Sequence, residues 1–158
     1  MALLILAAFT CSTSDSADAC QVPPEGSTQA GLLADARRQT AFEILYPCQL
    51  PGATTLESVA VTGAPGRQQA ELIFSGPFEL AVRQSQVPPP VNPDPAGASR
   101  INIDLFANVR AILIERNDGS AKALYHLFWE RNGLYYEVQA VGPPLQRRQV
   151  LLVATSLE

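Results

Sequence analysis

The chain has 158 residues, of which 47% are hydrophobic and 16% charged, and its formal net charge is -4. This composition is far from that of disordered proteins, and a domain of this length buries roughly two-thirds of its unfolded surface. Affinity for a phosphate backbone depends on clustered Lys and Arg, but the basic residues here are scattered, with doublets only at Arg37-Arg38 and Arg147-Arg148. The sequence therefore predicts a globular protein that does not bind nucleic acid.

Residues 1–26 differ in character from the rest of the chain. The run MALLILAAF, residues 1–9, has the length of the apolar part of an export signal and is too short to span a bilayer. No Lys or Arg precedes this run, and the small-x-small sequence Ala17-Asp18-Ala19, which has the form of a cleavage site, lies far from it. We expect a signal-like leader and linker, followed by one domain over residues 27–158.

Two other interpretations of this leader stay open. Cys11 could carry a lipid, as the cysteine of a bacterial lipoprotein does, or the apolar run could be a buried strand or helix. The signal and lipoprotein interpretations both predict an exported protein that is secreted or lipid-anchored and touches the membrane only through its signal or its lipid.

Three cysteines, Cys11, Cys20 and Cys48, are an odd number for an exported chain. If Cys11 is removed or carries lipid, Cys20 and Cys48 remain as a disulfide pair, which would stabilise the fold by roughly 3 kcal/mol; two free thiols are the alternative. The chain has a single His and no C-x-x-C pair, so the sequence predicts neither a metal site nor a cofactor.

The first half of the domain predicts a helix followed by strands. Residues 27–42 have one mildly apolar face and Ser27 or Thr28 as N-cap. Pro47 and Pro51 then leave residues 42–46 as an extended segment. Alternating apolar residues predict strands over residues 55–62, 68–75 and 78–85, with the last two paired as a hairpin.

Residues 87–99, VPPPVNPDPAGAS, hold five prolines and no periodic apolar pattern. Such a composition predicts an extended loop with polyproline character. The loop is either a plain connection or a flap or docking segment presented beside the sheet.

The second half predicts a meander and a closing helix. Residues 100–106 alternate Ile101, Ile103 and Leu105 with polar residues, and residues 108–116 are apolar on both faces and belong in the sheet interior. After a turn at residues 117–120 comes a hairpin, and Pro143-Pro144 predicts the start of a helix over residues 145–157 whose apolar face packs on the sheet. The fold class is therefore α+β, an antiparallel sheet of seven or eight strands with an N-terminal and a C-terminal helix.

The hairpin around Asn132-Gly133 is the strongest local signal, because this pair favours a type I′ turn and fixes the register of both strands. Since side chains alternate along a strand, one face carries Tyr125, Leu127, Trp129, Tyr136 and Val138 and should belong to the core. The other face is mixed in character. Its candidate ligand-binding residues are Leu124, His126, Phe128 and Tyr135.

Catalytic patterns give little support to an enzyme. A Ser-His-Asp hydrolase would have to use His126, the single histidine, and no G-x-S-x-G elbow is present. The carboxylates Glu130 and Glu137 are separated along the hairpin, and no phosphate-binding glycine loop is found. We therefore predict no catalytic residues.

Three segments resemble a bacterial family of extracytoplasmic domains of unknown function. They are AFEILYPCQLPGATTLESVAV, ANVRAILIE and LFWERNGLYYEVQAVGPPLQRRQVLLVATSLE, which together span about residues 40–158. Members of that family form the outer portions of anti-sigma-factor and sporulation-associated membrane proteins, and others are lipoproteins. The resemblance implies an antiparallel sheet covered by helices, distantly like the periplasmic lipoprotein carriers, and implies no catalytic residues. The sequence lacks the transmembrane and sigma-binding parts of the anchored members, so we do not expect anti-sigma activity.

Three functional hypotheses follow. The leading one is a non-enzymatic binding or sensory module of the bacterial cell envelope, whose partner is an envelope protein or an apolar small molecule. The second is a carrier that holds a lipid or another apolar ligand between the sheet and its helices, using Leu124, Phe128 and Tyr135. The third is a hydrolase that uses His126.

Overall fold

The computed structural model describes residues 20, 22–90, 94–106, 108–116, 122–142 and 145–157. The signal-like run, Cys11, the cleavage-like site at residues 17–19 and the expected turn at residues 117–120 lie outside these residues, as does the Pro143-Pro144 pair. The elements, in chain order, are α1 (Thr28–Gln39), β1 (Thr55–Thr62), β2 (Gln69–Ser75), β3 (Glu79–Ser85), β4 (Ser99–Phe106), β5 (Val109–Arg116), β6 (Ala123–Arg131), β7 (Leu134–Gly142) and α2 (Arg147–Thr155).

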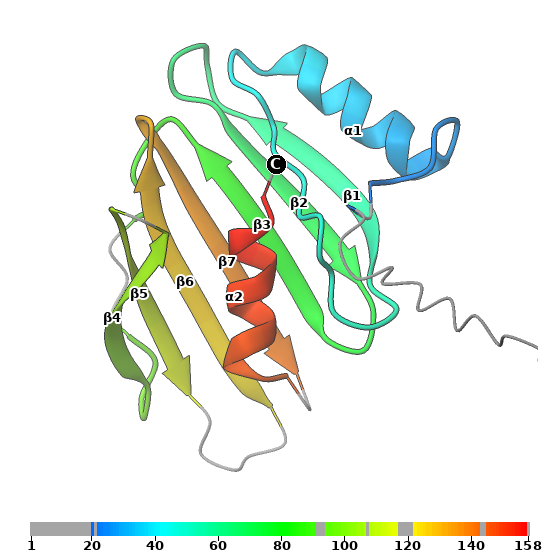
Figure 1. Cartoon of the computed structure of the whole chain (residues 1–158). Helices are drawn as coiled ribbons and strands as arrows, with labels where there is room; N and C mark the ends of the chain where they lie inside the picture. Colours follow the sequence, from blue (N-terminus) through cyan, green and yellow to red (C-terminus); the bar gives the residue numbers. More distant parts are fainter. Residues whose placement is uncertain are drawn as a thin grey trace, which may run out of the picture.

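The strands of the described residues form one antiparallel sheet of seven strands, in the order β1-β2-β3-β7-β6-β5-β4 (Figure 1). The first three strands follow one another along one half of the sheet, and the last four form a meander that folds back so that β7 pairs with β3. The predicted antiparallel sheet with an N-terminal and a C-terminal helix is confirmed, and more of the chain is strand than helix.

The hairpin of β6 and β7 has the predicted register throughout, from Arg131 opposite Leu134 to His126 opposite Gln139. Asn132 and Gly133 adopt the positive φ angles, 55° and 75°, that a type I′ turn requires. The predicted core face is also confirmed, because Leu127 and Val138 are fully buried and the stacked rings of Trp129 and Tyr136 are nearly so.

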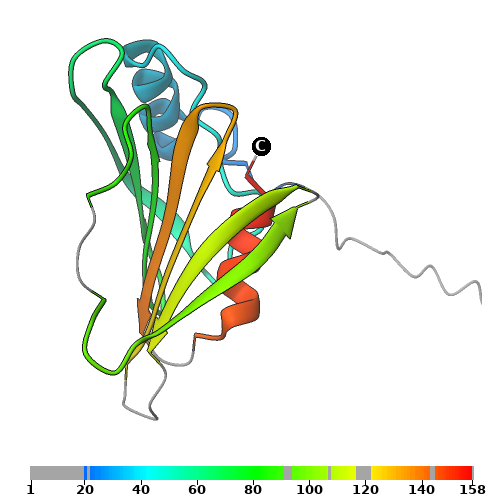
Figure 2. The same ribbon diagram turned by 90° about the vertical axis from the view of Figure 1, so that its left-hand side faces the viewer.

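Both helices lie on the same face of the sheet and contribute to one hydrophobic core (Figures 1 and 2). Helix α1 packs on β1 through Leu33 and Ala36, and α2, with Val150, Val153 and Ala154 buried, packs on β7, β6 and β4. The expected apolar face of the C-terminal helix is thus confirmed.

The helix limits differ from the predicted ones. Ser27 caps α1 by accepting a hydrogen bond from the Ala30 amide, as expected, but α1 ends at Gln39. Helix α2 begins at Arg147 rather than at residue 145, because Leu145 is buried before the helix and Gln146 is an extended N-cap whose amide donates to the side chain of Gln149. It ends at Thr155, so that Leu157 can form a β-bridge with Pro47.

The extended segment after α1 is held on the sheet by two buried glutamines. The side chain of Gln84 accepts from the Leu45 amide at 2.9 Å and donates to the Leu45 carbonyl at 2.7 Å. Gln68 does the same between the Ala41 amide, at 2.8 Å, and the Gln39 carbonyl, at 2.7 Å. Each glutamine thus imitates a strand partner and satisfies backbone groups that no strand reaches.

A disulfide joins Cys20 to Cys48 across 28 residues of sequence. It is one of the two states that the sequence allowed for this pair, and it attaches the chain before α1 to the segment that follows it. Within the described residues, neither helix is long and apolar enough to span a membrane.

Candidate functional site

The face of the sheet that points away from α1 and α2 is called here the outer face. Because side chains alternate, the buried core residues fix which positions point outward on every strand. On β3, β7, β6 and β5, the residues of the outer face include Ala81, Arg83, Ile112, Ile114, Leu124, His126, Phe128, Tyr135, Glu137, Gln139 and Val141.

The four candidate binding residues all lie half-buried on this outer face, three on β6 and Tyr135 on β7. The rings of His126 and Phe128 are in contact, with centroids 3.9 Å apart. Leu124 lies opposite Val141 at one end of the hairpin, and Tyr135 lies near the turn at the other end. The structure thus brings His126 and Phe128 together and separates Leu124 from Tyr135.

This placement corrects one element of the carrier hypothesis. Leu124, Phe128 and Tyr135 point away from the helices, because their strand neighbours Leu127 and Val138 fill the core beneath α2. These three residues therefore cannot line a space between the sheet and its helices.

A row of charged side chains crosses the outer face. Arg83 of β3 donates from Nε to Glu71 of β2 at 2.5 Å and from Nη1 to Glu137 of β7 at 2.7 Å. The same Glu137 oxygen is hydrogen-bonded to Nε2 of His126 on β6. Four neighbouring strands are therefore linked by one chain of side-chain hydrogen bonds, in which Arg83 and His126 share Glu137.

The electrostatics of this row centre on a carboxylate that is only 10% exposed. Burial raises the pKa of Glu137, but the hydrogen bond and charge of His126, together with Arg83, outweigh burial and hold the pKa below its usual value. Burial lowers the pKa of Arg83, while the charge of Glu137 and the hydrogen bond to Glu71 raise it by more. Both pKa shifts favour the charged forms of Glu137 and Arg83, and the row links β2, β3, β7 and β6 on their outer side.

The sequence did not reveal Glu71 and Arg83 as partners of the hairpin. Glu71 lies opposite Arg83 within the β2–β3 hairpin, but Arg83 lies opposite Glu137 only because β3 pairs with β7, a strand that follows it by about 50 residues. Alternation alone places Glu71 and Arg83 on the outer side of the β2–β3 hairpin. To predict the contact between Arg83 and Glu137, the order of the strands in the sheet would have been needed.

The described parts of the Pro-rich segment, residues 87–90 and 94–99, lie on the side of the sheet opposite the helices (Figure 2). Pro89 lies with Arg83, Tyr135 and Glu137 around a small surface hollow. Further along, Asp94 forms a bidentate ion pair with Arg100 of β4, whose hydrogen bond lowers the pKa of the Asp94 carboxyl.

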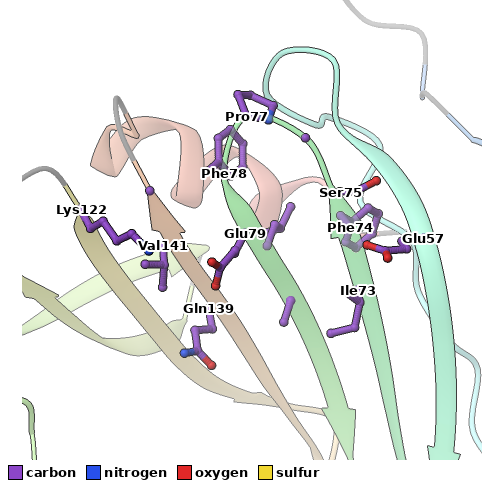
Figure 3. Close-up of a pocket in the computed structure, with 14 residues that line it drawn as sticks. Glu57, Ile73, Phe74, Ser75, Pro77, Phe78, Glu79, Lys122, Gln139 and Val141 are labelled. Carbon is purple, nitrogen blue, oxygen red and sulfur yellow. The ribbon is translucent and has the colours of Figure 1, made fainter.

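A groove of about 590 Å³ opens at the end of the outer face where β2 turns into β3 (Figure 3). Its floor is formed by half-buried Ile73, Ala81 and Val141 from three adjacent strands, and the turn at Gly76-Pro77 closes one end. The charged side chains at its rim are Glu57, Glu79 and Lys122.

The groove adjoins the mixed face of the hairpin. Ile73, Ala81, Gln139 and His126 are successive cross-strand partners in one row, and Val141 lies opposite Leu124. Leu124 and His126 therefore lie beside the floor of the groove, while Phe128 and Tyr135 lie farther along the sheet. An apolar floor with a few charged groups at its rim is the general character of small-ligand sites.

Chemical activation of His126 has little support in this geometry. Its cross-strand neighbours are Ile114 and Gln139, neither of which is a nucleophile, and its own hydrogen bond goes to Glu137. Among the described residues, no three His, Cys, Asp or Glu side chains are grouped so that they could hold a metal ion.

Comparison of the chain with models of known protein families, with curated proteins and with solved structures found no match. The family resemblance of the three segments therefore stays a prediction from sequence.

Proposed function

We propose that this protein is a non-enzymatic binding or sensory module of the bacterial cell envelope, and that it binds its ligand in the groove on the outer face. The observation that carries this proposal is the groove itself, in which half-buried Ile73, Ala81 and Val141 lie beneath a charged rim. Covering half-exposed apolar side chains on three strands with a ligand removes apolar surface from water, which is favourable in free energy.

The rim favours a ligand that carries a positive charge. Glu57 and Glu79 contribute two carboxylates and Lys122 one ammonium group, so the three groups have a net charge of -1. Figure 3 shows Glu57 on one side of the apolar floor and Lys122 on the other, with Glu79 between Ile73 and Val141. A compact apolar group with an attached ammonium matches both the floor and the rim, whereas a carboxylate in the same place meets two like charges.

The cellular location proposed here is outside the cytoplasmic membrane. The Cys20–Cys48 disulfide supports it, because such bonds persist in oxidising compartments. The signal-like run at residues 1–9 and the resemblance to extracytoplasmic domains support it from the sequence. Fractionation that recovers the chain from the cytoplasm with Cys20 and Cys48 reduced would contradict the location without bearing on the groove.

The groove is tested with hexylammonium as a probe, because its chain fits an apolar floor and its charge suits an acidic rim. Titration into isotope-labelled full-length protein should shift the backbone NMR signals of Ile73, Ala81 and Val141. Hexanoate, which has the same chain length and the opposite charge, should shift them much less. Equal effects of the two probes, or shifts spread over the helices, would contradict the proposed site.

A matched pair of variants separates the groove from general surface binding. Ala81→Trp places a large ring on the floor and should abolish the hexylammonium shifts. Ala60→Trp makes the same substitution at an exposed position of β1 that does not line the groove, and should leave them unchanged. If both variants bind as the wild type does, the ligand site lies elsewhere.

A further inference from the structure

Strand β4 is an edge of the sheet with a sequence that is complementary to itself. It is the last strand in the sheet order, paired only with β5 along the described residues. A helix contacts the core side of each edge strand, α1 at β1 and α2 at β4, and β1 in addition has a bulge between Leu56 and Ser58. An edge strand presents a row of backbone N–H and C=O groups that another strand can complete.

The central residues of β4 read Arg100-Ile101-Asn102-Ile103-Asp104. Ile101 and Ile103 are half-buried on the core side, because they lie opposite Leu113 and Ala111 of β5. Arg100, Asn102 and Asp104 are exposed on the outer side. The pattern is symmetric about Asn102, with isoleucines on one face and opposite charges at the two ends of the other.

If this segment pairs antiparallel with the same segment of a second copy, each of its five residues meets a complementary residue. A two-fold axis through Asn102 places Ile101 against Ile103 of the second copy on the core side. On the outer side it places Arg100 against Asp104 of the second copy, once on each side of the axis. Both kinds of cross-strand pair stabilise antiparallel strands, and a two-fold interface requires such self-complementarity.

We propose that two copies of this chain associate through antiparallel pairing of β4 about Asn102, which joins their sheets into one continuous sheet. The pairing covers the half-exposed isoleucines and satisfies the free backbone edge. It ends after Asp104, because a register irregularity between Asp104 and Phe106 interrupts the regular strand.

Charged residues on an edge strand often prevent it from pairing with another chain. Blocking is most effective when like charges meet or when a charge points into the core of the pair. Here, both charges point outward, and each would meet its opposite in the two-fold arrangement. Arg100 already pairs with Asp94 in its own chain, at 48% side-chain exposure, and keeps donors available for a second carboxylate.

Sedimentation velocity on the full-length chain tests the proposal through charge reversal. All proteins carry Cys11→Ser, so that no disulfide through this residue links two copies. The starting protein should form a reversible dimer over about a hundredfold range of concentration. Arg100→Asp and Asp104→Arg should each weaken the dimer by about tenfold or more, because each sets like charges against each other twice.

The decisive sample is an equimolar mixture of the two variants. The aspartate introduced at position 100 of one chain would then meet the arginine introduced at position 104 of the other. The unchanged Asp104 of the first chain would likewise meet the unchanged Arg100 of the second, so the mixture should form a heterodimer. The double variant with both changes should also regain the dimer.

The control is Arg67→Asp, which makes the same change of charge in an exposed turn at the other edge of the sheet. It should dimerise as the starting protein does.

A starting protein that stays monomeric at every concentration overturns the proposal. So does dimerisation of both single variants at the original strength, or failure of their mixture to associate while each variant keeps its thermal unfolding transition. None of these outcomes bears on hexylammonium binding, because the groove lies on β2, β3 and β7.

Discussion

Replacement of Arg83 by Met removes the cation between two carboxylates while keeping the apolar stem that packs on the outer face. The ion pair with Glu71, whose side chain is 27% exposed, contributes about 0.5 kcal/mol at most. Glu137 is 10% exposed and loses a charge-assisted hydrogen bond, worth about 1.5–3 kcal/mol. We expect Arg83→Met to lower the free energy of unfolding by about 2 kcal/mol.

Urea denaturation followed by tryptophan fluorescence measures this loss, since Trp129 is buried in the core beside Tyr136. Thermal unfolding should show a midpoint lower by roughly 4–8 °C for a chain of this length. Adding Glu137→Gln to Arg83→Met should recover part of the loss, because no buried charge is then left without its cation. If the two changes instead lower stability additively, Arg83 and Glu137 are not energetically coupled and the reasoning is refuted.

Three further substitutions follow from the same structure. The pKa of Glu137 is held below its ordinary 4.5, so the stability that its carboxylate contributes is present above pH 4.5 and is lost as the pH falls through the lower folded-state pKa. Urea denaturation at about pH 7 and about pH 3 should therefore show a smaller loss of stability for Glu137→Gln than for the wild type. Cys20→Ser with Cys48→Ser should lower the free energy of unfolding by about 3 kcal/mol, and a reductant should have the same effect on the wild type but none on the variant. Gly142→Ala should lower the thermal midpoint by roughly 4 °C or more, since the new Cβ would lie 2.8 Å from Cβ of Phe78 at a residue with φ of 145°; a midpoint equal to that of the wild type would show that the strand shifts freely there.

The sequence predicted those parts of the fold that depend on neighbouring residues. Alternation placed β1 at its observed limits, Thr55–Thr62, and the Asn132-Gly133 pair determined every partner in the closing hairpin. The start of α2 was placed too early because a proline favours the first helical turn without requiring it. Burial of Leu145 moved the start to Arg147.

Local sequence patterns could not predict which strands and segments pair when they are far apart in the sequence. The glutamines Gln68 and Gln84 read as ordinary polar strand residues, although both are buried and hold the extended segment after α1. The groove likewise combines Ile73, Ala81 and Val141 from strands whose adjacency only the β3–β7 pairing creates. The mixed face of the hairpin was recognised as the candidate site from alternation, but the sequence could not place it on the side away from the helices.

The core face of the sheet determines the geometry of the outer face. Leu127, Val138 and Val82 are fully buried in one cross-strand row, so a shift of one residue in any of these strands would move an apolar side chain out of the core and a polar one into it. That energetic cost fixes the register, and the register in turn sets Glu137 between Arg83 and His126 and forms the floor of the groove. A ligand bound in the proposed groove would therefore meet a surface that is arranged beforehand, and its binding would require little ordering of the strands beneath it.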